Sequence, residues 1–434
     1  MKNSFQTILI GICVAAFIVA ILIFSGIIKI GSSNSTQATG GTIVVWGTYS
    51  PDAIQGYFDQ LTVQNPDLTL TYTQKSPDTF RSSVIGALAD GVAPDLVIAD
   101  SSTLLSIKDR LYTIPYATYT ERLYRDSFVD GASVFLSKEG VMAVPLVVDP
   151  LVVYYNKDLL AGQSFVTPPV SWTGLVQSLS RFLKKDAKGV ILQTPIGLGE
   201  ADNVNHYKDI LSALFLQTGN SVVGLNANTG TYEQRIGLGV EGQNELGTVK
   251  ALTFYTNFAN QANSSYTWSR TLPSTLDMFL SGKSAFYIGR ASELFTIQSR
   301  NPNLNFDVTT LFQADGAVRP ITFGVFSGMS ILKSTTQFPL AYSVLGMLST
   351  PQFNQYVAGT LSLPPAKRDL LLTQQQNPYI QVFFKAALST FTWPDTNPAA
   401  TESVFRDMVR AVNSGRSSAQ EAIYQGSQDL QSVI

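Results

Sequence analysis

Cysteine and histidine are almost absent from this chain of 434 residues. Its only cysteine is Cys13, which excludes an intrachain disulfide and any CxxC site for a metal or for redox chemistry. Its only histidine is His206, so clusters of zinc-binding histidines are excluded as well. We therefore expect no metal and no cofactor.

Charge is sparse too, because only 14% of the residues are charged. The 29 basic and 31 acidic residues leave a formal net charge of −2, and no basic cluster stands out along the chain. Binding to a phosphate backbone requires such a cluster, so we expect no nucleic-acid partner. The chain also lacks a nucleophile elbow, an HExxH motif and a P-loop, which makes an enzyme the less favoured class.

The amino terminus is apolar. Residues 7–28 are uncharged and mostly aliphatic, and as a helix these roughly 22 residues would cross the hydrocarbon core of a bilayer. We expect residues 1–30 to form one N-terminal transmembrane helix that anchors the protein, with an unusual signal peptide as the alternative. The Gly/Ser/Thr-rich residues 31–41 are expected to be a flexible linker.

The residues that flank this apolar segment suggest its orientation. Lys2 precedes it and Lys29 follows it, which is compatible with an amino terminus in the cytoplasm. The body of the protein is then expected on the extracytoplasmic side of the cell membrane. A lipid on Cys13 is disfavoured, because Ile12 and not a small residue precedes the cysteine.

The first part of the body alternates strands and helices. Two serine–proline pairs, Ser50-Pro51 and Ser76-Pro77, each place a capping residue before a first-turn proline and predict the start of a helix. Short runs of apolar and β-branched residues precede and follow these helices. The expected strands are residues 42–46, 68–73 and 96–99. This βαβαβ order predicts a mostly parallel sheet with helices on its faces.

The remainder continues in the same way. A strand is expected to contain residues 153–155, and a helix capped by Ser171 follows it. A short helix around Phe279 and a strand at residues 284–288 are expected next. Residues 219–247 are rich in Gly and Asn and predict a loop or a hairpin. Further helices are expected at residues 339–348, 352–358 and 402–412. A chain of this length is expected to form two lobes rather than one core.

The order of several short segments is similar to a known family. These segments are IVVWGTYS from residue 43, FRSSVIGALADGVAPDLVIADSS from residue 80, VPLVVDPLVVYYNKDLL from residue 144, PPVSWTGL from residue 168, FLSGKSAFYIGRASEL from residue 279 and FGVFSGMSILK from residue 323. Together they resemble the extracellular solute-binding proteins of ABC sugar importers, the maltose-binding-protein-like group. The return strand of that family often has Trp where this chain has Phe323 or Phe326.

The resemblance implies an α/β, two-lobed periplasmic-binding-protein-like fold of type II with several hinge crossings. It assigns residues 42–148 and 290–326 to the N-lobe, and residues 149–289 and 327–434 to the C-lobe. The crossings between the lobes are expected near residues 147–151, 286–290 and 323–330. Bending of such extended segments would close the lobes on a ligand.

The same resemblance implies candidate ligand-binding residues in the cleft between the lobes. A sugar needs aromatic faces for its C–H surface, and carboxylates or amides for its hydroxyl groups. The candidates are Trp46, Tyr49, Asp100, Ser101, Asp149, His206, Arg290, Phe323, Trp393 and Asp395.

Several of these residues have an alternative structural role. Trp46 would equally fit the core, and Asp100 would equally cap a helix. Asp149 would equally form a salt bridge at a hinge, and Arg290 would equally pair with Glu293 one helical turn later. A lone histidine such as His206 is more often a surface or hydrogen-bonded residue than a ligand-binding one.

The expected function is that of an extracytoplasmic solute-binding protein of an ABC importer. It would bind a small polar ligand, a mono- or oligosaccharide, by hinge closure and deliver it to the permease subunits. The alternative is a membrane-anchored extracellular carbohydrate-active hydrolase that uses Asp100 and Asp149 as acid and base. A surface receptor or adhesin without a transport role is a third class.

Overall fold

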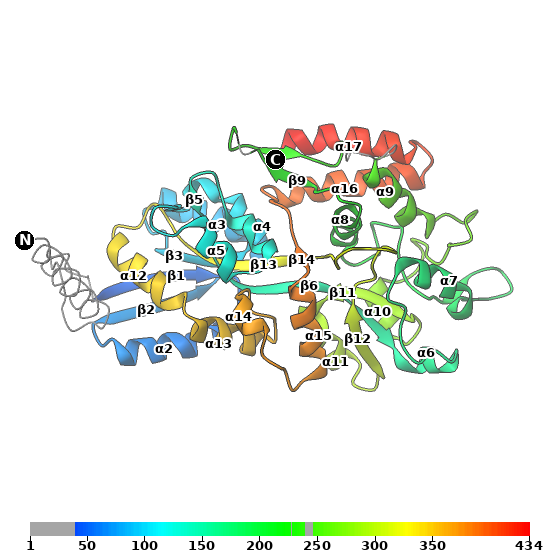
Figure 1. Cartoon of the computed structure of the whole chain (residues 1–434), viewed down its shortest axis with the longest axis horizontal. Coiled ribbons are helices and arrows are strands. Elements are labelled where there is room, and N and C mark those ends of the chain that lie inside the picture. Colours follow the sequence, from blue (N-terminus) through cyan, green and yellow to red (C-terminus); the bar gives the residue numbers. More distant parts are fainter. Residues whose placement is uncertain (1–39, 227, 239–245) are drawn as a thin grey trace, which may run out of the picture.

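The computed structural model describes residues 40–226, 228–238 and 246–434. The predicted anchor, residues 1–30, lies outside the described residues, and so does nearly all of the predicted linker. Within the described ranges, no helix combines the length and the apolar character that a membrane span needs. The described chain packs into two halves, one at the left and one at the right of Figure 1.

The sheet of the first half begins with the predicted βαβαβ unit, which is thereby confirmed. The first three strands of this sheet along the chain are parallel. A strand from late in the chain lies between the third of them and the fourth strand of the sheet, and it is antiparallel to both. The strands lie in the order β2 (Leu68–Gln74), β1 (Gly41–Gly47), β3 (Leu96–Asp100), β13 (Thr322–Ile331) and β6 (Val144–Asn156).

Helices from both ends of the described chain cover this sheet. Prolines stand at the first turn of α3, α12 and α13, where the missing N–H costs no hydrogen bond. The elements are η1 (Pro51–Ala53), α2 (Gln55–Gln64), α3 (Pro77–Ala89), α4 (Ser101–Ser106), η2 (Lys108–Arg110), β4 (Ile114–Pro115), α5 (Glu121–Ser127), η3 (Asp130–Phe135), β5 (Gly140–Val141), α12 (Phe338–Leu348), α13 (Pro351–Leu361), α14 (Arg368–Leu371) and α15 (Pro378–Ala387).

The second half is built on the far end of β6, which pairs there with two antiparallel strands, β11 and β12. Its elements are α6 (Lys157–Gly162), α7 (Trp172–Phe182), β7 (Lys184–Lys185), β8 (Ile191–Gln193), α8 (Tyr207–Gln217), β9 (Val223–Leu225), β10 (Tyr232–Gln234), α9 (Gly247–Asn257), α10 (Thr275–Leu280), β11 (Phe286–Arg290), η4 (Ala291–Glu293), α11 (Leu294–Arg300), β12 (Phe306–Thr310), β14 (Thr390–Phe391), α16 (Pro398–Asn413) and α17 (Ala419–Val433). The predicted Ser171 cap is confirmed, because its hydroxyl accepts a hydrogen bond from the N–H of Gly174.

Two long strands carry the chain from one hydrophobic core to the other. In β6, the buried residues up to Val148 belong to the first core. Beyond Asp149 the two faces of the strand differ, with Leu151 and Val153 in the second core and Val152 and Tyr154 in the first. In β13, Phe323 belongs to the second core and Phe326 to the first. Both strands are extended and continuous where they pass, so the two halves are joined by paired strands rather than by a loose linker.

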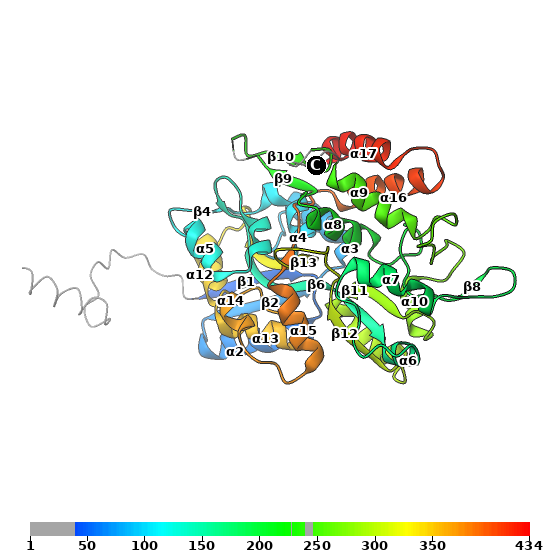
Figure 2. The same ribbon diagram turned by 45° about the vertical axis from the view of Figure 1, so that its right-hand side comes forward.

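The packing of two segments bears on the predicted assignment of residues to lobes, which stays a prediction. Residues 290–326 were expected in the N-lobe; β12 pairs with the far end of β6, and its buried Phe306 and Val308 belong to the first core. Residues 327–434 were expected in the C-lobe, yet Leu340 and Phe353 of α12 and α13 enter the first core. Figures 1 and 2 both show these yellow and orange helices beside β1 and β2. The apolar face of a helix does not encode which core it will meet.

Candidate functional site

Polar side chains gather where the two halves meet, at the ends of β1, β3 and β11 and in the middle of β6. They come from segments far apart in the sequence and act on one another electrostatically: the charges of Asp100 and Asp149 help to raise the pKa of Tyr49 and that of Arg290. We call this group the junction cluster. Its members are Tyr49, Asp100, Asp149, His206, Asp209, Arg290 and Glu293.

Arg290 is the central cation of the junction cluster. Its Nε and Nη2 atoms donate hydrogen bonds of 2.9 and 2.6 Å to one oxygen of Asp209, and the Arg290 side chain is still 30% exposed. Burial would raise the pKa of Asp209, but the guanidinium and His206 hold it well below its usual range. The predicted pairing of the Arg290 side chain with Glu293 is wrong, because it is the backbone N–H of Arg290 that donates to Glu293, at 2.9 Å.

His206 lies between two carboxylates. Its Nε2 atom is 3.0 Å from an oxygen of Glu293, and its Nδ1 atom is 3.7 Å from Asp209. Burial would lower the pKa of the imidazole, but the two carboxylates outweigh it and raise the pKa to about 9. His206 also adopts a left-handed backbone conformation, with φ of 57°, directly before α8. The histidine is therefore a cation of the junction cluster at neutral pH.

Asp149 lies at the point where β6 passes between the cores. Its two oxygens accept hydrogen bonds from the backbone N–H and the hydroxyl of Ser292, at 3.0 and 2.7 Å. Burial raises the pKa of Asp149, and the charge of Arg290 offsets this only in part. No salt bridge to this carboxylate is found within the described residues, so the alternative of a hinge salt bridge gives way to a hydrogen-bonded carboxylate.

The two aromatic candidates after β1 differ. The Tyr49 hydroxyl donates to the hydroxyl of Ser327 on β13, and burial raises the pKa of Tyr49 well above its usual range. Trp46 is partly buried against the first core, and the ammonium group of Lys75 lies 4.0 Å from the centre of its ring. Tyr49 thus belongs to the junction, whereas one face of Trp46 is already in contact with a cation.

Asp100 caps α4. One oxygen accepts from the N–H of Thr103 at 2.9 Å and from the hydroxyl of Ser102 at 2.6 Å, and the other accepts from the hydroxyl of Thr103 at 2.8 Å. Ser101, the first residue of the helix, is buried. The structure therefore shows the capping role for Asp100, and the role of both residues in ligand binding stays a prediction.

The remaining candidates lie in the second core. Phe323 and Trp393 are 6% and 3% exposed, and the Trp393 ring stacks on Phe405 while its N–H donates to Ser212. Asp395 is 8% exposed and accepts from Lys208 at 2.7 Å. Each of these three side chains thus has a structural role at its position.

The sequence matches one protein family over most of its length. The profile of the bacterial extracellular solute-binding proteins matches residues 56–414. The chain belongs to this family. A comparison with curated proteins finds no match.

Solved structures share the fold of this solute-binding protein. A cyclo/maltodextrin-binding protein complexed with maltotetraose has a TM-score of 0.73 at 16% identity, covering 93% of this chain and 98% of that one. The cyclic α-maltosyl-1,6-maltose-binding protein of Arthrobacter globiformis has a TM-score of 0.73 at 14% identity, covering 91% and 99%. The sugar-binding protein MalE of Xanthomonas citri has a TM-score of 0.72 at 18% identity, covering 91% and 97%. The predicted α/β solute-binding fold is confirmed.

Family membership also bears on the class of function. The matching family consists of binding proteins, which agrees with the prediction that the chain is not an enzyme. No comparison supports the alternative of a carbohydrate-active hydrolase.

Sequence reasoning missed two ionised members of the junction cluster, Asp209 and Glu293. Asp209 follows His206 by three residues, and Glu293 follows Arg290 by the same spacing. Two cation–carboxylate pairs at helical spacing were therefore visible, but both were open to interpretation as local pairs. The fold adds a distant partner to each cation: Arg290 binds Asp209, and His206 binds Glu293 while Asp209 also stays 3.7 Å from His206.

The junction cluster offers a solute-binding protein both donors and acceptors. It contains four carboxylates and two cations, with a tyrosine hydroxyl at its edge. Hydroxyl groups of a ligand donate to carboxylates and accept from a guanidinium, so the cluster suits a polar, uncharged ligand. The described part of the chain holds no group of three or more His, Cys, Asp or Glu side chains placed to bind a metal ion.

Proposed function

We propose that this protein is the extracytoplasmic receptor of an ABC importer and that it binds a mono- or oligosaccharide between its two halves. The N-terminal residues 1–30 would anchor it in the cell membrane as a single-pass helix, and permease subunits would receive the ligand. The halves would then be the two lobes of a type II fold, which the order β2-β1-β3-β13-β6 supports. In this proposal the N-lobe consists of residues 42–148 and 325–388, and the C-lobe consists of residues 149–324 and 389–434.

The observation that carries this proposal is the junction cluster. Tyr49 follows β1 and Asp100 ends β3 in the first half, whereas His206 precedes α8 and Arg290 ends β11 in the second half (Figure 1). In open α/β sheets, ligands bind beyond the carboxyl ends of the strands. A ligand held by side chains of both halves favours the closed arrangement of the two, which is the change that a permease can recognise.

The ligands of structurally similar proteins support a sugar. Two of the three proteins described above bind maltotetraose and a cyclic maltosyl-maltose. The receptor GacH of Streptomyces glaucescens binds acarbose, and a solute-binding protein of Thermotoga lettingae binds α-D-tagatose. All of these ligands are neutral or amino carbohydrates rich in hydroxyl groups.

Three connections would serve as the hinge. Two are the passages through β6 and β13 described above, and the third follows α15, where Ala387 belongs to the first core and Trp393 to the second. Extended segments can bend by small changes of backbone angles without loss of side-chain packing, so closure would leave both cores intact.

A thermal-shift panel of neutral saccharides tests the proposal. Because the ligand binds the folded state alone, saturation at 100 times Kd should stabilise the protein by about 2.7 kcal/mol and raise its Tm. Arg290→Ala should abolish the shift, whereas Arg300→Ala, which removes an exposed guanidinium that pairs with Asp277, should retain it. If no saccharide raises the Tm while an amino acid or a peptide does, the assignment to sugars is wrong.

A further inference from the structure

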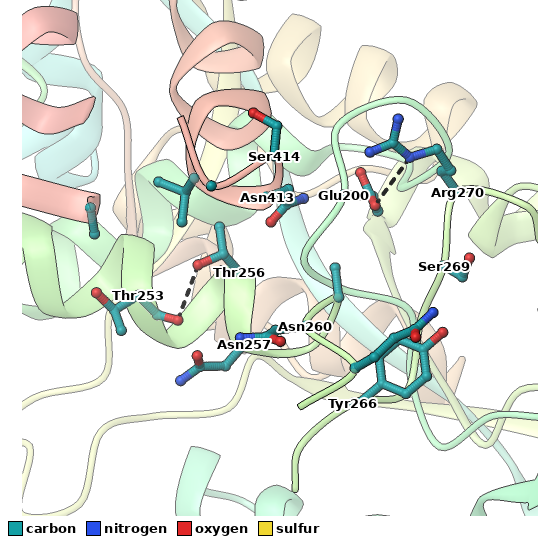
Figure 3. Close-up of a pocket in the computed structure, with 15 residues that line it drawn as sticks. Glu200, Thr253, Thr256, Asn257, Asn260, Tyr266, Ser269, Arg270, Asn413 and Ser414 are labelled. Carbon is teal, nitrogen blue, oxygen red and sulfur yellow. Dashed lines mark hydrogen bonds and ion pairs between the residues drawn. The ribbon is translucent and has the colours of Figure 1, made fainter. Parts of the chain in front are cut away.

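The second half contains a polar pocket that is separate from the junction cluster. It lies between the C-terminal end of α9, the loop that follows, and the turn between α16 and α17 (Figure 3). No member of the junction cluster lines it. Its polar lining includes Glu200, Asn257, Asn260, Gln261, Arg270 and Asn413.

A buried carboxylate lines this pocket. The side chain of Glu200 is 8% exposed, and the nearest cation, Nε of Arg270, is 3.8 Å away, beyond hydrogen-bond distance. Burial raises the pKa of Glu200, and the charge of Arg270 offsets this only in part. Figure 3 shows the two side chains facing each other, with Asn413 beside Glu200. The Asn413 side chain also lowers the pKa of Glu200 by hydrogen bonding, but burial still prevails. A carboxylate in this setting gains from the further hydrogen bonds that a ligand can donate.

The backbone that presents Glu200 is held in place. The hydroxyl of Tyr255 donates to the carbonyl of Glu200 at 2.7 Å, and the amide of Asn413 donates to the carbonyl of Gly199 at 2.7 Å. Gly199 has a φ of +94°, and a Cβ there would lie 2.6 Å from the backbone nitrogen of Ala259. The backbone at Glu200 therefore has a defined position before any ligand binds, which lowers the entropic cost of binding.

Amide side chains line the same pocket. In the described part of the chain, the side chains of Asn257 and Gln261 make no hydrogen bond, and the side-chain oxygen of Asn260 accepts only from the N–H of Ala262. Amides both donate and accept, as hydroxyl groups of a ligand do. Glu200 and Arg270 are the only charged residues of the lining, and their charges cancel. A phosphate or a metal ion would need an excess of one sign, so the lining fits a neutral polyhydroxylated ligand.

We propose that this pocket is a second carbohydrate-binding site, which holds a neutral saccharide unit on the C-lobe outside the junction of the two halves. Glu200 would accept from ligand hydroxyls, Arg270 would donate to them, and Asn257 and Gln261 would do both. An oligosaccharide held there would raise the local concentration of ligand near the interlobe site without requiring closure of the lobes.

Equilibrium dialysis of the full chain with labelled maltotetraose, and in parallel with mannobiose, tests this proposal. We expect two sites per chain for at least one of the two probes. Thr253→Trp, at an exposed position of α9, should fill the pocket and leave one site, whereas Thr296→Trp, at an exposed position of α11, should leave two. Glu200→Gln should weaken the second site at least tenfold without a change of shape.

The two sites fail independently. If Arg290→Ala removes one of two sites and Thr253→Trp removes the other, the proposal is supported. If Thr253→Trp removes the only site present, the pocket is supported and the interlobe site is overturned. An unchanged stoichiometry in both Thr253→Trp and Glu200→Gln, or the absence of any binding of either probe, overturns the second site.

Discussion

Protonation of His206 gives the sharpest prediction, because this chain has no other histidine. The folded protein raises the pKa of His206 from 6.5 to about 9. Burial and the charge of Arg290 act against the protonated form, whereas Asp209 and Glu293 act for it and prevail. The folded state therefore binds the proton more tightly than the unfolded chain does.

The size of the effect follows from linkage. One pKa unit corresponds to about 1.4 kcal/mol, so the rise is worth about 3 kcal/mol of folding free energy. A raised pKa gives stability that is fully present below pH 6.5 and is lost as the pH rises through about 9. Stability should therefore fall by an amount of this order between pH 6.5 and 9.

Nuclear magnetic resonance measures this pKa directly, because a protein purified without a histidine tag contains one imidazole ring and gives one set of imidazole signals. The chemical shift of the His206 ring should titrate near pH 9. His206→Asn keeps a residue that tolerates the left-handed backbone, and its urea-unfolding free energy should lose the decline above pH 6.5. A midpoint at or below 6.5 would refute the reasoning, because the two carboxylates would then not hold the proton.

Three further predictions concern stability, measured by urea unfolding. Asp209→Asn should cost about 3 kcal/mol, because it leaves the partly buried guanidinium of Arg290 without its partner. Asp149→Asn should cost less, since burial disfavours that carboxylate, and equal costs would contradict this reasoning. Trp393→Ala should lower the free energy of unfolding by about 3–5 kcal/mol, because the side chain is buried. A loss of ligand affinity with normal stability would show instead that Trp393 is not a core residue. Gly199→Ala should destabilise the protein more than Gly189→Ala. Both glycines have a positive φ, but only at Gly199 would the added Cβ meet a backbone atom. A larger effect at Gly189 would count against this close contact.

The strands and helices that sit nearest the site were readable from the sequence because local signals mark them. The serine–proline starts, the Ser171 cap and the apolar runs of β1 and β3 each depend on neighbouring residues only. The position of Arg290 at the end of β11 was readable for the same reason. These signals were sufficient for the family resemblance and for the fold.

The partners within the junction cluster were not readable, because they depend on contacts between distant segments. Arg290 and Asp209 are 81 positions apart, and Asp149 and Ser292 are 143 apart. Trp393 depends on such contacts as well: the sequence offered it as a ligand-binding candidate, and its ring stacks on Phe405 in the second core. Aromatic residues of a core and of a binding site have the same identity in a sequence, and only their neighbours distinguish them.

Hydrogen–deuterium exchange with a saturating saccharide tests the central claim most directly. A ligand held between the two halves should slow the exchange of backbone amides in both of them. We expect this protection around Tyr49, Asp100 and Asp149 and at residues 290–293. Protection that is confined to the pocket around Glu200, or to one half alone, would contradict binding at the junction.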